Sequence, residues 1–237
     1  MYLWKCWRDT SSAFLVFLGA WLAVGAWGAY VHFDPFGWIA VKPDASQVNW
    51  RMLSGGMVSS LIGLTPFTGL VLGALGVGME FEKGTAAFLL TRPRARRRLL
   101  WTSWSLGAAQ MIALLFLSFA VNWLARSPSG ARVSARNFAS MSVVGLVIYS
   151  LTYLMTTLTR NSRYGTGLSL LVFTAYMGMY LWLRFWHEIE MDFFLGTLFK
   201  DGWRWDLETL AVALLGWLTV CLAMTLVAQS SFERAEI

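Results

Sequence analysis

Residues 99–124 read LLWTSWSLGAAQMIALLFLSFAVNWL, directly after the basic run RPRARRR at residues 92–98. A helix needs about 20 predominantly apolar residues to cross the hydrocarbon core of a bilayer, and residues 99–124 contain no Asp, Glu, Lys, Arg or His. Basic residues beside a transmembrane helix collect on the cytoplasmic side. The two segments together predict a transmembrane helix that enters the membrane from the cytoplasm.

The same pattern recurs along the whole chain. Of its 237 residues, 57% are hydrophobic and only 14% are charged, whereas soluble domains carry about 25% charged residues. Five further apolar stretches are long enough to span and contain no ionisable residue: 13–31, 57–79, 138–158, 165–183 and 210–227. The sequence therefore predicts an all-α membrane protein, a single transmembrane domain over residues 1–237 with six transmembrane helices.

The basic residues of the short loops predict how these helices are oriented. If both termini lie on one side of the membrane, that side holds 11 of the 19 Lys and Arg residues but only five of the 13 acidic residues. We expect that side to be the cytoplasm of a cell with a bacterial-type inner (plasma) membrane. Residues 1–10 have the pattern of an amphipathic interfacial helix on this side. On the outer side, residues 186–206 suit a re-entrant or surface-lying helix.

The formal net charge of +6 also bears on the choice of partner. A nucleic-acid-binding surface needs Lys and Arg gathered on a soluble face. Here most of the excess lies in short loops between apolar blocks, where anionic lipid accounts for it. We expect a lipid membrane and no nucleic acid as partner.

The cytoplasmic loop after the second predicted span contains the most informative motif. Glu80 and Glu82 mark the point at which the chain leaves the lipid. Gly84 breaks the helix, and Thr85 is a suitable N-cap for a new one. The sequence predicts a short cytoplasmic helix over residues 86–90.

This short helix is predicted to expose an apolar surface formed by Phe88, Leu89 and Leu90. Pro93 is expected to end it, because the residue before a proline disfavours helical geometry. An apolar helix that stands clear of the membrane is suited to a groove on a partner protein. The simpler interpretation is a basic cytoplasmic loop with no partner.

The loop resembles that of permease subunits in type-2 ATP-binding-cassette exporters. Their pattern is Glu-x-Glu-x-Gly-Thr, then Leu-Leu-x-x-Pro and an Arg three residues later. The matching positions are Glu80, Glu82, Gly84, Thr85, Leu89, Leu90, Pro93 and Arg96. The predicted layout of six spans and a long outer loop after the fifth also agrees. The run of arginines is denser than the usual pattern, and no acidic residue follows Leu90 in this loop.

The resemblance implies a division of labour between subunits. Two permeases, as a homodimer or a heterodimer, would form the pore, and two copies of a separate ATPase subunit would bind ATP and Mg. Each ATPase would grip the helix of residues 84–93. The permease itself would bind no cofactor and would not be an enzyme. In agreement, Lys83-Gly84-Thr85 lacks the preceding glycine of a phosphate loop, and Leu53-Ser54-Gly55-Gly56 falls on the predicted outer side.

Three smaller features of the sequence carry expectations of their own. Pro66 lies inside the second predicted span, where it removes a backbone hydrogen bond, so it is either a hinge or a static kink. Gly69 and Gly73 have the spacing of a close helix contact, here between two copies of the chain. Cys6 and Cys221 form no metal or disulfide pattern and are expected to be apolar fillers.

Two other classes of function remain as alternatives. One is a polytopic membrane scaffold, without transport, whose basic loop binds lipid or a soluble partner. The other is an ion-coupled carrier, but ion coupling normally needs an ionisable residue within a span, and none of the six predicted spans has one. Intramembrane proteolysis is disfavoured because no His-Glu-x-x-His motif occurs.

Overall fold

The computed structural model describes residues 2–33, 64–82, 93–124, 128–186 and 207–234. Every regular element in these ranges is a helix. The helices are α1 (Tyr2–Phe33), the segment Leu64–Leu75, α3 (Gly78–Glu82), α5 (Pro93–Leu124), α6 (Pro128–Thr159), α7 (Ser162–Trp186) and α9 (Leu207–Glu233). For the described residues, the prediction of an all-α fold is confirmed.

Three of the described helices contain a segment long and apolar enough to cross a membrane. These segments are Arg97–Leu117, Met141–Thr159 and Leu214–Glu233. They overlap the predicted spans 99–124, 138–158 and 210–227. Large apolar side chains such as Phe116 and Leu215 are exposed on the outside of the bundle. Such a surface is unfavourable in water but matches lipid tails, so the chain is an all-α membrane protein.

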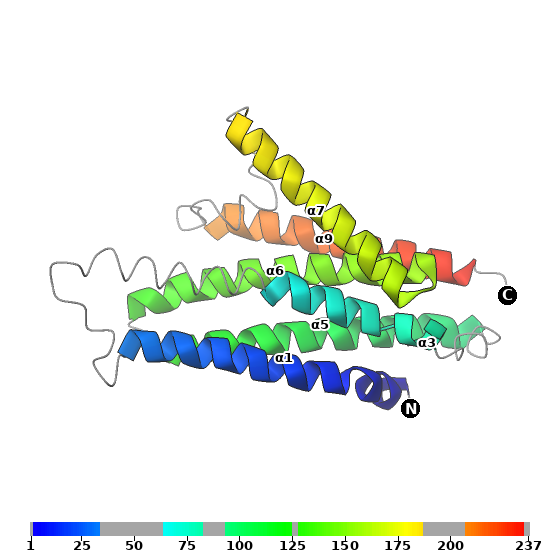
Figure 1. Ribbon diagram of the computed structural model, residues 1–237, viewed down its shortest axis with the longest axis horizontal. Helices are drawn as coiled ribbons and strands as arrows, with labels where there is room; N and C mark the ends of the chain where they lie inside the picture. Colours follow the sequence, from blue (N-terminus) through cyan, green and yellow to red (C-terminus); the bar gives the residue numbers. More distant parts are fainter. Residues whose placement is uncertain (1, 34–63, 83–92, 125–127, 187–206, 235–237) are drawn as a thin grey trace.

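Helix α6 lies at the centre of the bundle, because it packs against α5, α7 and α9, while α1 lies along α5 (Figure 1). The largest fully buried side chains include Trp21, Met111 and Leu114. Two buried tyrosines of α6 form hydrogen bonds with backbone carbonyls of α5. The Tyr149 hydroxyl donates to the Trp104 carbonyl over 3.0 Å, and the Tyr153 hydroxyl donates to the Leu100 carbonyl over 2.9 Å.

Glycines allow the segment Leu64–Leu75 to approach α6 closely. A Cβ at Gly69 would lie 3.0 Å from the Gly145 carbonyl oxygen, and one at Gly73 would lie 2.8 Å from both the Tyr149 carbonyl oxygen and the Thr152 Cβ. The glycine pair therefore packs inside the chain. The expectation that it joins two copies is wrong, because α6 already occupies this face.

The second predicted span, 57–79, is interrupted near its C-terminal end. Its described part is helical to Leu75, bends at Gly76 and Val77, and resumes as α3 at Gly78. The amides of Glu80 and Phe81 donate to the Val77 carbonyl, so these two hydrogen bonds join α3 to the bend. The five-residue helix α3 is therefore a separate element that follows the segment Leu64–Leu75.

The predicted interfacial helix 1–10 and the predicted span 13–31 form one continuous helix, α1. The expected boundary between them is absent, because the hydroxyls at this point bond back to the helix. Thr10 donates to the Cys6 carbonyl over 3.0 Å and Ser11 donates to the Arg8 carbonyl over 3.0 Å. Such bonds bend helices without ending them. In Figure 1 the first turns of α1 are seen nearly end-on, at an angle to the rest of the helix.

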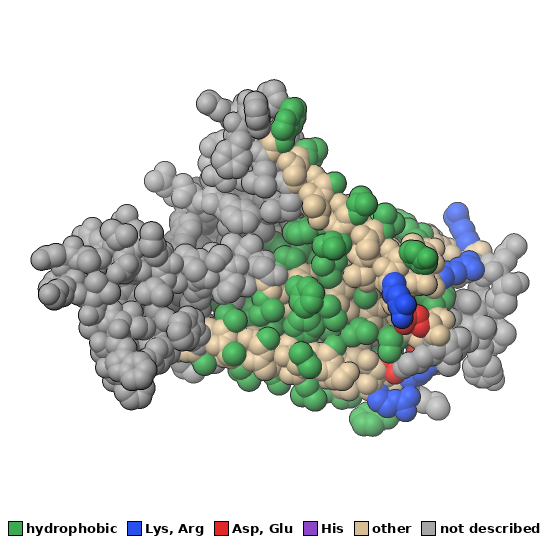
Figure 2. All heavy atoms as spheres, viewed as in Figure 1, with side chains coloured by type: hydrophobic (Ala, Val, Ile, Leu, Met, Phe, Trp, Pro, Cys, Tyr) green, Lys and Arg blue, Asp and Glu red, His purple; other side chains and the backbone are tan. Residues whose placement is uncertain are grey.

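Charged side chains gather at one end of the bundle. This end is formed by the start of α1, α3, the start of α5, the turn between α6 and α7, and the end of α9 (Figure 1). Figure 2 shows the blue and red side chains at this end and green side chains along the adjoining surface. We call it the charged end. Its residues are those that the sequence places on the cytoplasmic side.

Candidate functional site at the charged end

Helix α3 lies where three other helices meet. Because successive residues of a helix are rotated by about 100°, neighbouring side chains point in different directions. Glu80 contacts α1 through Lys5, Phe81 contacts α9 through Phe232, and Glu82 contacts the start of α7 through Ser162. We call this set of six residues the α3 junction. Its contacts join residues that are up to 151 positions apart in the sequence.

The contact with α1 is an ion pair. The Lys5 ammonium donates to the Glu80 carboxylate over 2.7 Å, and the two side chains are 29% and 5% exposed. A carboxylate removed from water to this extent needs a partner, since an unpaired buried charge is strongly unfavourable. The pair therefore holds the first turns of α1 against α3.

The contact with α9 is aromatic. The rings of Phe81 and Phe232 lie 5.8 Å apart at an angle of 74°, an edge-to-face arrangement. Pairs of this kind contribute about 0.5–1.5 kcal/mol beyond the burial of their area. Phe232 is buried, so the end of α9 is packed against α3.

The contact with α7 combines a hydrogen bond with close backbone packing. The Ser162 hydroxyl donates to the Glu82 carboxylate. A Cβ at Gly78 would lie 2.9 Å from the Ser162 Cβ, so the glycine allows α3 to sit against the start of α7. The Asn161 side chain accepts hydrogen bonds from the amides of Arg163 and Tyr164 and so caps α7. The residue that Glu82 contacts is therefore held at a fixed helix start.

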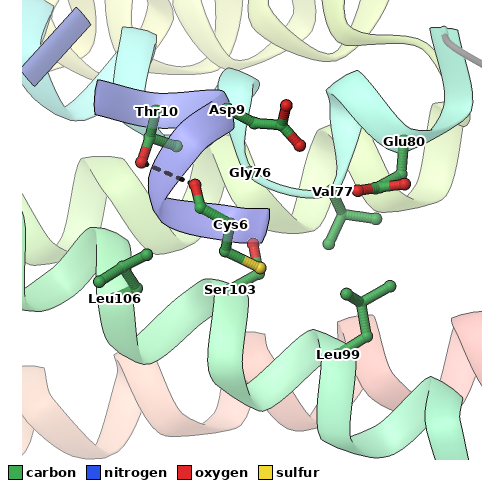
Figure 3. A pocket seen from close by; sticks show the side chains of 9 residues that line it. All are labelled: Cys6, Asp9, Thr10, Gly76, Val77, Glu80, Leu99, Ser103 and Leu106. Carbon is green, nitrogen blue, oxygen red and sulfur yellow. Dashed lines mark hydrogen bonds between the residues drawn. The ribbon is translucent and has the colours of Figure 1, made fainter. Parts of the chain in front are cut away.

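A small hollow lies beside α3. Figure 3 shows its lining from α1, α3, the bend before α3 and α5: Cys6, Asp9, Thr10, Gly76, Val77, Glu80, Leu99, Ser103 and Leu106. Its free volume is about 10 Å³, which holds about one water molecule. The hollow is too small for a nucleotide or a transported molecule.

The lining of the hollow includes the thiol of Cys6. Burial, and to a lesser extent the nearby Glu80 carboxylate, raises the pKa of the Cys6 thiol to about 11. The thiol is therefore neutral at neutral pH and is a poor nucleophile and metal ligand. No group of three His, Cys, Asp or Glu residues within the described ranges is arranged to hold a metal ion. Cys6 and Cys221 are both free and buried, as expected for apolar fillers.

The structure brings together only part of the predicted coupling motif. Glu80 and Glu82 both lie on α3 and both make contacts within the chain. Pro93 is the first residue of α5, a position that suits proline because no helical amide bond is needed there. Arg96 lies in the first turn of α5. The other predicted residues lie outside the described ranges: Gly84, Thr85, Phe88, Leu89 and Leu90.

Pro66, the predicted kink, lies near the beginning of the described segment Leu64–Leu75. The bend that the structure does show falls further along, at Gly76 and Val77. The partners Lys5, Ser162 and Phe232 were not predicted from the sequence. Glu80 and Lys5 are 75 residues apart, and Glu82 and Ser162 are 80 residues apart, so no local spacing could indicate these pairs.

The helical bundle and its exposed apolar surface define the class of this protein as an all-α membrane protein. Residues 31–237 match the model of a family described as "Protein of unknown function (DUF2705)", and the chain belongs to that family. No curated protein matches the chain.

Proposed function

We propose that this chain is the membrane-spanning permease subunit of a type-2 ATP-binding-cassette exporter. It crosses a bacterial-type inner membrane six times with both ends in the cytoplasm, and two permeases form the pore. Two copies of a separate ATPase subunit bind ATP and Mg and supply the energy. The chain holds no nucleotide and catalyses no reaction of its own.

The α3 junction is the observation that carries this proposal. The loop of residues 83–92, which resembles the ATPase-binding loop of such permeases, begins directly after Glu82. Three consecutive residues before it contact α1, α9 and α7. A displacement of the loop is thereby passed to three helices at once. A basic loop whose only role is to keep this part of the chain on the cytoplasmic side needs no such junction.

The bend at Gly76 and Val77 supports the same function. It separates α3 from the segment Leu64–Leu75, which is packed closely on α6 through Gly69 and Gly73. Short elements joined by a bend can change their relative angle, as hinges between rigid bodies do. In this mechanism α3 turns with the loop, and the ATP-driven closure of the ATPase pair favours one of two arrangements of the bundle.

Co-purification with an ATPase tests the proposal. The full-length chain is co-expressed with an ATPase subunit encoded in the adjacent reading frame and purified in mild detergent. We expect ATP hydrolysis to co-purify with the chain. Leu89→Asp should reduce the retained ATPase at least about tenfold, because a charge in an apolar groove costs more than about 1.4 kcal/mol. The matched control is Tyr164→Asp, which adds the same charge at an exposed position of the charged end.

A second variant separates binding from coupling. Glu82→Ala removes the acceptor of the Ser162 hydroxyl but leaves residues 83–92 intact. The ATPase should still be retained, while transport-linked stimulation of ATP hydrolysis should fall. If no ATPase is retained by the unmodified chain, or if Leu89→Asp retains as much as Tyr164→Asp, the chain is better explained as a membrane scaffold. Uptake or release driven by an ion gradient without ATP would favour a carrier.

A further inference from the structure

Exposed arginines gather at the charged end of the bundle. Six arginine side chains are exposed there: Arg8, Arg97, Arg98, Arg160, Arg163 and Arg234. They come from the start of α1, the start of α5, the turn between α6 and α7, and the end of α9. Figure 2 shows blue side chains at several places around this end. A ring of like charges of this kind repels itself unless an anionic partner faces it.

The acidic residues of the same end do not balance this charge at the surface. Glu80 is almost fully buried and is paired with Lys5, and Asp9 is partly buried in the lining of the hollow. Of the described acidic residues at this end, only Glu82 and Glu233 are exposed, and their carboxylates accept hydrogen bonds from Ser162 and Gln229. Within the described part of the chain, the exposed charge of this end is therefore strongly positive.

Apolar side chains are exposed beside the arginines. Leu3 and Trp4 are 59% and 69% exposed, on the first turns of α1. The same turns bend away from the axis of the rest of α1 (Figure 1). Tyr164, at the start of α7, is 74% exposed. Trp and Tyr favour the level of the lipid headgroups, where an apolar ring and a polar edge are both accommodated.

We propose that the charged end binds anionic phospholipid headgroups, with Trp4 and Leu3 inserted at the membrane surface and Arg97 and Arg98 facing the phosphates. The charge of the surface selects an anionic partner. The exposed apolar anchors select a lipid surface over an acidic protein, because large apolar side chains are also exposed further along the same helix, at Leu15 and Val16. Arg97 and Arg98 lie directly before Leu99, where the apolar part of α5 begins. This inference does not depend on the proposed transport function.

Lipid binding to the full-length protein in detergent tests the proposal. Phosphatidylglycerol and phosphatidylcholine of equal chain length are titrated separately, and bound lipid is measured by native mass spectrometry. We expect phosphatidylglycerol to bind at least about tenfold more tightly. The double variant Arg97→Gln with Arg98→Gln should weaken its binding roughly 30-fold, since each arginine near an anionic surface contributes about 1 kcal/mol. Raising the salt concentration should weaken it as well.

Two control variants make the result specific. Arg97→Lys with Arg98→Lys keeps the charge and should bind phosphatidylglycerol within about threefold of the unmodified chain. Arg132→Gln with Arg136→Gln removes the same charge from the first turns of α6, at the opposite end of the bundle (Figure 1), and should change nothing. Equal binding of the two lipids to the unmodified chain overturns the proposal. The proposal is also overturned if the α6 variant loses as much phosphatidylglycerol binding as Arg97→Gln with Arg98→Gln. A third outcome would also contradict the proposal: the unmodified chain binds both lipids equally, while Arg97→Gln with Arg98→Gln reduces the ATPase that co-purifies. That result would assign these arginines to a protein partner.

Discussion

At the scale of single residues, the ion pair between Lys5 and Glu80 is the contact on which the α3 junction depends most. Its carboxylate is almost fully buried while its ammonium keeps partial access to solvent. Such a pair affects stability mainly when one partner is removed. The remaining buried charge then loses the attraction that offset its removal from water. The phenylalanine pair and the Ser162 hydrogen bond contribute less, since neither leaves a buried charge behind.

Removing the positive charge of this pair should destabilise the protein. We expect Lys5→Met to lower the free energy of unfolding by about 1–3 kcal/mol, because it removes the cation that lies 2.7 Å from the buried Glu80 carboxylate. The change should appear as a decrease of a few degrees in the melting temperature of the detergent-solubilised protein. The exchange Lys5→Glu with Glu80→Lys should recover part of the loss.

Glu233→Gln is the matched control for this prediction. It also changes one charge at the charged end, but Glu233 is exposed, and exposed substitutions usually change stability by less than about 0.5 kcal/mol. If Lys5→Met is as well tolerated as Glu233→Gln, the ion pair does not hold α1 against α3. An additive effect of Lys5→Met and Glu80→Gln in a double-mutant cycle would lead to the same conclusion.

At the scale of secondary-structure elements, the contact between the segment Leu64–Leu75 and α6 depends on the absence of side chains. We expect Gly73→Ala to destabilise the protein by about 1–3 kcal/mol, because the new methyl group overpacks the contact. It would lie 2.8 Å from the backbone oxygen of Tyr149, which cannot move aside as a flexible side chain would. Thermal unfolding in detergent measures the effect.

Gly216→Ala is the control for this element. A Cβ at Gly216 on α9 would meet nothing within 4 Å, and alanine favours a helix by up to about 1 kcal/mol relative to glycine. The variant should therefore be neutral or slightly stabilising. Equal effects at Gly73 and Gly216 would mean that the close packing on α6 is not required.

The apolar pattern of the sequence predicts the cores of these helices better than their ends. Residues 99–124 were predicted as a span, and α5 ends at the same residue, Leu124, but begins six residues earlier, at Pro93. The apolar pattern marks only the part of the helix that is apolar. The helix itself begins earlier, because proline suits the first helical position and arginine has a high helix propensity. The opposite error occurs in the span 57–79, where the apolar pattern continues across the bend at Gly76 and Val77.

Of the six residues of the α3 junction, only Glu80 and Glu82 were predicted from the sequence. Glu80 and Glu82 stand out because acidic residues at the end of an apolar stretch are uncommon. Their partners do not, because the contacts are set by the way whole helices pack and not by local spacing. Phe232, for example, is one of 16 phenylalanines in the chain, and nothing near it in the sequence indicates that it packs against Phe81.

At the scale of the whole molecule, charge and apolar surface are separated along the bundle. Charged side chains gather at one end (Figure 2), and large apolar side chains are exposed along α1, α7 and α9. This separation matches a membrane with its cytoplasmic face at the charged end. With that orientation, which the basic residues predict, α3 lies at the cytoplasmic face, as the proposed function requires.

Fusion reporters test this orientation across the full chain. Alkaline phosphatase is active only outside the cytoplasm, so a fusion after residue 45, 130 or 196 should be active, because these positions fall in predicted outer loops. A fusion after residue 88, 161 or 237 should be inactive, since the basic residues around the inner loops keep them in the cytoplasm. Fluorescent-protein fusions at the same sites should give the reverse pattern. Activity of the phosphatase after residue 88 would place the loop beside α3 outside the cell, beyond the reach of any ATP-driven partner, and the proposed coupling through the α3 junction would then be wrong.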